Sequence, residues 1–303
     1  MIVPRTRQLV LQTVKYLGPT LLSLLAYDVA VVVAYHMGYL QWAALQETPL
    51  SLFGSGIGVI LAFRNSTSYA RWWEARTLWG SIVNNSRSWG RLVTTTLQMN
   101  PDNLEFAEVQ RRMVYYQIAW VHVLRQHLRR LDPFTEIASL LSAEEIDSLR
   151  GQSNVAVAIQ QRQSVLLRDA LDRGWIDVAQ WHAMNQSLDD LVDAQGGAER
   201  IKNTPMPRQY DYMPQLCAKI FCILLPITLV SSLGWFTPLG STLVGFVFLA
   251  LDKIGRDLED PFDNTINDIP LTSITRTIEI NLRQMLGETE LPEPVVPVND
   301  ILW

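Results

Sequence analysis

The stretch "ILAFRNSTSYARWWEAR", residues 60–76, passes within a few positions from apolar side chains to arginine, hydroxyl residues and paired tryptophan. Upstream of it lies the apolar, glycine-containing segment "PLSLFGSGIGVILAF", residues 49–63. The whole chain of 303 residues is 48% hydrophobic and holds ten tryptophans, which is more apolar than most soluble proteins. An apolar run that ends in such a belt, in a chain of this composition, favours insertion into a membrane.

Four apolar segments predict an all-α integral membrane protein with four transmembrane helices per subunit. They cover residues 17–40, 49–63, 216–235 and 239–251. The first has the roughly 20 residues that a span needs. The second is too short to cross alone unless it is tilted or shielded by other helices. The third and fourth are separated only by "FTPLG" and predict a helical hairpin.

The basic residues flank the outer ends of the two predicted hairpins, whereas the connections "QWAALQETP" and "WFTPLG" contain none. The positive-inside rule therefore places both termini and the middle of the chain in the cytoplasm. The predicted parts are an N-terminal segment with the first hairpin (1–64), a cytosolic helical region (65–210), a second hairpin (211–252) and an acidic segment with a helix and a Pro-rich tail (253–303).

The cytosolic region has helical periodicity in two places. In residues 106–130 one broad apolar face is expected, formed by Phe106, Val109, Met113, Tyr116, Ile118 and Val121. A second helix, "AQWHAMNQSLDDLVDAQGG", is expected to end at its two glycines, Gly196 and Gly197.

Several functional classes find no support in the residues. A net charge of −5 without a basic face argues against nucleic acid as a partner. Cys217 and Cys222 lie in an apolar run and suggest neither a disulfide nor a metal site. His122 and His127 are five apart, not on one helix face, and are expected at the surface or as caps. No catalytic constellation emerges, so we expect no enzyme activity and no cofactor.

Two acidic features allow more than one interpretation. Asp28, inside the first span, is either functional or a buried group with a polar partner. The segment "GRDLEDPFDNTINDIPL", residues 255–271, offers oxygen ligands of the kind calcium prefers but lacks the EF-hand spacing. A helix end broken by Pro261, with Asn267 or Asp268 capping the next helix, explains most of it.

The helix at residues 49–63 has two stripes. Gly54 and Gly58 lie four apart and predict close packing against neighbouring helices. Ser55, Val59 and Phe63, also four apart, form a separate stripe. That stripe either packs against protein or, if several subunits share an axis, forms the rings of a narrow apolar tube that gates by dewetting. On the residues alone, ordinary packing is the favoured interpretation.

Two motifs together alter that interpretation. "AFRNSTSYARWWEARTLWG" after the glycine-containing helix and "LEDPFDNTINDIPL" after the last span resemble the bestrophin family, specifically its bacterial homologues, over nearly the whole chain. The resemblance implies a homopentameric ion channel in the bacterial inner membrane, with one pore on the symmetry axis. It also implies that the three side chains of the stripe are the rings of a hydrophobic neck. Arg71, Trp72 and Trp73 would then anchor the same helix at the cytoplasmic interface.

The chain departs from the family pattern at three places. Ser55 stands where relatives usually carry a large aliphatic side chain, which predicts a wetter and wider first ring. The cytosolic constriction of the family falls on Ala179, or on Val178 if the register shifts by one. The acidic run keeps Asp268 as a remnant of the calcium clasp of animal relatives, so we expect no metal site there.

The sequence constrains ion selectivity less than it constrains the fold. The uncharged rings set no sign, and both the bacterial branch and the acidic total favour small monovalent cations. An anion (chloride) channel of the same fold is one alternative. A membrane scaffold or sensor that does not conduct is another. The expected partners are further copies of the chain, monovalent ions and the lipid bilayer.

Overall fold

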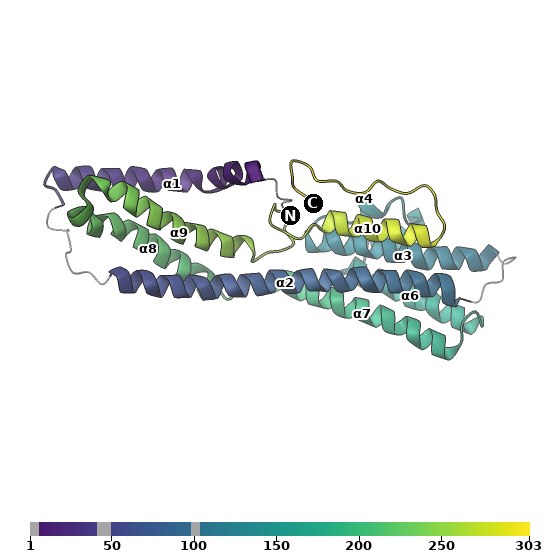
Figure 1. Cartoon of the computed structure of the whole chain (residues 1–303). Helices are drawn as coiled ribbons and strands as arrows, with labels where there is room; N and C mark the ends of the chain where they lie inside the picture. Colours follow the sequence, from purple (N-terminus) through teal and green to yellow (C-terminus); the bar gives the residue numbers. More distant parts are fainter. Residues whose placement is uncertain (1–5, 41–49, 98–103) are drawn as a thin grey trace. The chain divides into compact units, whose positions relative to one another are not determined.

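The structure is a computed structural model that describes residues 6–40, 50–97 and 104–303, with side chains from residue 16 onward except that of Leu104. Within these ranges the secondary structure is helical, apart from one isolated β-bridge between Val298 and Ile301. This confirms the all-α prediction for the described residues (Figure 1). The elements are α1 (Thr6–His36), α2 (Leu50–Thr96), α3 (Leu104–Leu128), α4 (Phe134–Ile137), α5 (Ala143–Leu149), α6 (Val155–Asp172), α7 (Val178–Asn203), α8 (Arg208–Leu233), the 3-10 turn η2 (Gly234–Phe236), α9 (Thr237–Asp257) and α10 (Leu271–Met285).

The described residues form two compact units. The span unit comprises residues 6–40, 50–72 and 205–260, and the bundle unit comprises residues 73–97, 104–204 and 261–303. The sequence analysis placed the corresponding boundaries after residues 64, 210 and 252. The first boundary lies inside α2, which is one helix of 47 residues rather than a short apolar segment. Since α2 contains no proline, nothing in its sequence ends the helix where its composition changes.

The span unit is built from α1, α8, α9 and the first part of α2. Two segments are long and apolar enough to cross a membrane: Tyr16–His36, and Arg208–Asp257, which includes α8, η2 and α9. The predicted hairpin is therefore present, with η2 as its turn (Figure 1). Gly245 of α9 lets α1 approach closely, because a methyl group at that position would overlap Leu24.

Asp28 of α1 is fully buried in this unit. Its Oδ2 atom accepts a hydrogen bond from the hydroxyl of Thr242 on α9, at 2.9 Å. Of the two interpretations that the sequence left open, this contact agrees with a buried group that has a polar partner. The two cysteines are free thiols, with Cys222 buried among the same helices.

The bundle unit is organised around α3, which packs against α4, α6, α7 and α10. The predicted apolar face of α3 is confirmed, since its six members are all buried. The expectation for His122 is wrong, however, because neighbouring helices cover α3 on every side. His122 is 3% exposed, and its Nε2 atom lies 3.0 Å from Oε2 of Glu279 on α10. His127, nearer the end of α3, is partly exposed as predicted.

The expected helix end at Gly196 and Gly197 is also wrong. Both glycines lie inside α7, which continues to Asn203. A Cβ atom on Gly197 would stand 2.8 Å from Cδ2 of Leu78 on α2. This glycine therefore serves a close approach between two helices and not a helix end.

In the bundle unit, the carboxylate of Glu145 has a strongly shifted pKa. Glu145 accepts hydrogen bonds from Tyr116 Oη at 2.5 Å, Arg112 Nη2 at 2.9 Å and the backbone N–H of Ser142. Burial by itself would raise the pKa of Glu145, but these hydrogen bonds outweigh it and lower the pKa to about 2.

The lowered pKa of Glu145 predicts acid sensitivity. Because the folded pKa lies below the unfolded one, the stabilisation is present above about pH 4.5 and is lost as the pH falls toward 2. We expect Glu145→Gln to remove about 1–3 kcal/mol of stability at neutral pH and much less near pH 2.5. Denaturant unfolding of both proteins at the two pH values measures this difference. An equal difference at both values would contradict it.

Candidate functional site

Residues 50–68 of α2 have a buried face and an exposed face. The buried face carries Gly54, Ile57, Leu61, Arg64 and Ser68. Ile57 and Leu61 form an apolar cluster with Ala218, Phe221 and Leu225 of α8. This packing fixes the orientation of α2 about its own axis within the span unit.

The predicted stripe lies on the exposed face. Val59 is 55% and Phe63 is 67% exposed, and Ser55 is exposed as well. At 3.6 residues per turn, these side chains lie about half a turn away from the buried row. The hydroxyl of Ser55 donates a hydrogen bond to the carbonyl of Ser51 at 2.8 Å. From Leu50 to Phe63 the helix has no ionisable side chain, so the stripe is neutral.

The two glycines of α2 have different surroundings. A Cβ atom on Gly54 would lie 3.1 Å from the ring of Phe221, so the backbone of α2 approaches α8 closely there. A Cβ atom on Gly58 would have no atom within 4 Å among the described residues of the chain. The packing role of Gly58 stays a prediction that requires a neighbouring subunit.

Arg64, one position after the stripe, points the opposite way and is 1% exposed. Its Nη1 atom lies 2.7 Å from Oδ1 of Asp252 on α9, and its Nη2 atom lies 2.5 Å from Oδ1 of Asp211 on α8. A third carboxylate, that of Glu259, lies 3.9 Å from Nη2. Asp252 also pairs with Arg256 at 2.9 Å. One guanidinium therefore holds α2, α8 and α9 together.

The surroundings of Glu259 reflect this concentration of acidic groups. Burial raises the pKa of Glu259, and the charges of Asp211 and Asp260 raise it further. The sequence analysis missed the cluster. The available signal was an arginine directly after one apolar run and an aspartate directly after the last one, because ionisable groups at the edge of such segments are usually paired.

The predicted interface anchors follow on α2. Arg71 donates from Nε to the backbone carbonyl of Glu259 at 2.7 Å. The ring of Trp72 stacks on Tyr69 with 6.3 Å between centroids, and Trp73 is 56% exposed. Their position relative to a lipid bilayer stays a prediction.

The candidate constriction residues begin α7. Asp177 is the N-cap, with a capping box to Gln180, and Gly174 has a φ of 69° in the preceding turn. Val178 is the first helical residue and is 71% exposed, and Ala179 is also exposed. Both side chains are thus available to a shared axis, and their role as a constriction stays a prediction.

Asp268 closes a turn in the acidic segment. It is 2% exposed, and its two carboxylate oxygens accept hydrogen bonds from the backbone N–H and the hydroxyl of Thr265. The expectation that Asn267 or Asp268 caps the next helix is wrong, because Pro270 occupies the N-cap of α10. Over the described ranges, no group of three or more His, Cys, Asp or Glu side chains is placed to hold a metal ion.

Comparison with known proteins gives consistent matches. A family model described as "Bacterial/Fungal Bestrophin protein" matches residues 8–284. The chain is 32% identical over 279 residues to a voltage-dependent anion channel-forming protein of Mesorhizobium japonicum, covering 92% of this chain and 87% of that one. It is 36% identical over 249 residues to the voltage-dependent anion channel-forming protein YneE of Escherichia coli, covering 82% and 80%. The crystal structure of a bacterial bestrophin homolog from Klebsiella pneumoniae matches with a TM-score of 0.83 and 31% identity, covering 89% of this chain and 98% of that one.

Proposed function

The chain belongs to the bestrophin family, in its bacterial and fungal branch, and on this premise we propose that it forms a homopentameric ion channel of the bacterial inner membrane. The observation that carries the proposal is the neutral stripe of Ser55, Val59 and Phe63, exposed on the helix face opposite the packed one. Five such stripes around an axis form a neck whose apolar rings repel water and so control conduction.

The proposed topology has four spans: α1, the first part of α2, α8 and α9. The first and the last two lie in segments that are long and apolar enough to cross a membrane. The short α2 span is supported by its packing against α8. The distribution of Lys and Arg places both termini in the cytoplasm. In this arrangement Val178 and Ala179 line the cytosolic exit.

The sequence-based preference for cations lacks support among the relatives. Both curated relatives described above are named anion channel-forming proteins. The neck itself carries no charge and does not oppose either sign. We therefore propose that the channel conducts small monovalent anions such as chloride, in place of the expected cations.

The test is reconstitution of the purified protein in a planar bilayer. We expect discrete single-channel steps. In a tenfold NaCl gradient we expect a reversal potential near the chloride equilibrium potential, roughly 59 mV from zero. A reversal potential near the sodium equilibrium potential would contradict anion selectivity and leave the channel intact. Silence in several salts would contradict the channel and favour a scaffold or sensor.

A further inference from the structure

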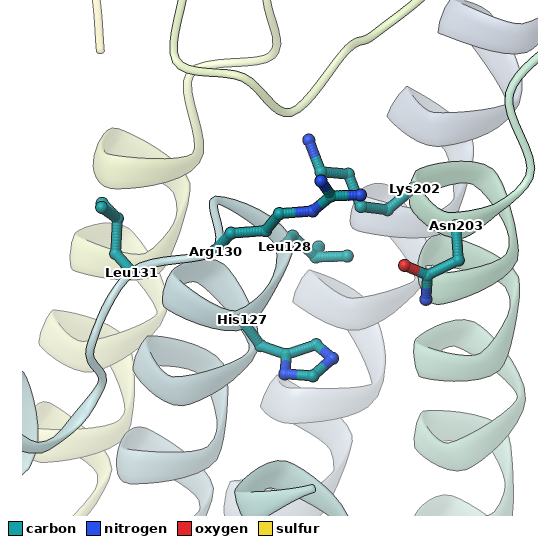
Figure 2. Close-up of a pocket in the computed structure, with 6 residues that line it drawn as sticks. All are labelled: His127, Leu128, Arg130, Leu131, Lys202 and Asn203. Atoms are coloured by element: carbon teal, nitrogen blue, oxygen red, sulfur yellow. The ribbon is translucent and has the colours of Figure 1, made fainter.

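A pocket of about 320 Å³ lies in the bundle unit, where α3 and α7 end. It is lined by His127, Leu128, Arg130, Leu131, Lys202 and Asn203. Figure 2 shows the side chains of Arg130 and Lys202 extending toward each other from the two sides of this pocket. Two cationic side chains from separate elements thus face one partly open pocket, which nothing in the proposed channel function uses.

The backbone of Arg130 is unusual. Its φ of 56° is in the left-handed region, where glycine is favoured. The hydrogen bonds from Leu131 N to Gln126 O, 2.9 Å, and from Arg130 N to His127 O, 3.0 Å, are those of a helix end that normally carries glycine. A strained non-glycine residue at such a place points to a use for its side chain.

Arg130 differs from the other basic side chains at the pocket. Lys202 is 10% exposed in its side chain and pairs with Asp263, and His127 lies 3.9 Å from Glu199. Among the described residues, no carboxylate pairs with the guanidinium of Arg130, so its donors are open to a ligand. The amide of Asn203 adds a neutral donor.

A simpler explanation exists for part of this arrangement. Cations near the C-terminal ends of helices interact favourably with the helix dipole, and both Arg130 and Lys202 are so placed. That explanation accounts for their charge. It accounts neither for the cavity between them nor for the left-handed backbone of Arg130, since a lysine or arginine in the last helical turn would serve the dipole without strain.

We propose that this pocket binds a phosphate-bearing small molecule. The phosphate would lie between Arg130 and Lys202, because a guanidinium presents paired donors that match phosphate oxygens. The organic part would contact Leu131, because Leu128 also lines the pocket but is fully buried. The volume suits a ligand larger than phosphate alone, since one water occupies only about 30 Å³.

The test uses the full-length protein in phosphatidylcholine nanodiscs, titrated with inorganic phosphate at constant ionic strength in a calorimeter. We expect a Kd on the order of 1 mM. Arg130→Gly should weaken binding at least about tenfold, because the charge-assisted hydrogen bonds are lost. The variant should fold at least as well as the wild type, because glycine adopts the φ of this position freely.

A matched control removes an arginine from the same unit but outside the pocket. Arg168 of α6 pairs with Asp172 on the surface, so Arg168→Ala should leave phosphate affinity unchanged. No binding by the wild type, or equal binding by all three proteins, would overturn the proposal.

Two further titrations distinguish a soluble ligand from a lipid headgroup as the source of the phosphate group. Phenyl phosphate should bind more tightly than inorganic phosphate if the apolar side chain of Leu131 contributes. In nanodiscs that contain phosphatidylglycerol, phosphate affinity in the wild type should stay the same for a soluble ligand. An affinity that falls there in the wild type but not in Arg130→Gly would support the site and identify a lipid headgroup as its occupant.

Discussion

Replacement of Arg64 by alanine should lower the free energy of unfolding by about 3–5 kcal/mol. The side chain is 1% exposed and lies within 2.7 Å of carboxylates on two helices. Without it, Asp211 and Glu259 lose their ionic partner, whereas Asp252 keeps Arg256. The side chain of Asp252 is 4% exposed and loses one of its two ionic partners, and that of Glu259 is 14% exposed. Leaving carboxylates of such low exposure short of a partner costs more than the pair itself contributes, which is why the effect of truncation is large.

Thermal unfolding of Arg64→Ala in detergent, compared with that of the wild type and two further variants, isolates this effect. Arg76→Ala removes an exposed arginine from the same helix and should change stability by less than about 0.5 kcal/mol. Arg64→Lys keeps the charge but lacks the planar fork, so its stability should fall between those of wild type and Arg64→Ala. If Arg64→Ala and Arg76→Ala unfolded at the same temperature, the cluster would have no stabilising role.

Truncation of the stripe should increase ion flow. In the proposed pentamer, Val59→Ala or Phe63→Ala would shrink a ring of five side chains at once, so the neck would widen and hold water more readily. We expect the single-channel conductance to rise roughly two- to tenfold, more for Phe63 than for Val59 because more apolar surface is removed. Recordings in planar bilayers under symmetric salt measure the change.

Ile60→Ala is the matched control for Val59→Ala. Ile60 is adjacent to Val59 and is 44% exposed, but it points about 100° away from Val59 around the helix, toward a cavity that Phe63 and Tyr210 also line. Its truncation should leave conductance near the wild-type value. A conductance that responds to Ile60 and not to Val59 would assign the pore to another face of α2.

Local patterns in the sequence predicted a substantial part of this fold. The apolar runs identified α1 and the α8–α9 hairpin, because each carries its signal within about 20 consecutive residues. The apolar face of α3 followed from its periodicity. The spacing of Ser55, Val59 and Phe63 likewise placed them on one face, and the structure leaves that face uncovered within the chain.

The sequence-based predictions that were wrong or incomplete concern contacts between residues far apart in the chain. His122 was expected at the surface because nothing near it in sequence reveals Glu279, which is 157 residues away. Gly197 was taken for a helix end because the same residue type serves close packing, and only Leu78 of another helix distinguishes the two. The arginine cluster was missed for the same reason, since each of its carboxylates lies in a different segment.

The partners of Arg64 also set an order of events during synthesis. Asp211 follows it by 147 residues and Asp252 by 188. At roughly 5–20 residues per second, a ribosome needs about 10 to 40 s to deliver them. Until then the guanidinium lacks the two aspartates that pair with it in the folded chain. In the proposed topology it would stay hydrated near the headgroups during that interval, so the first hairpin would reach its final packing only after the second hairpin has been synthesised.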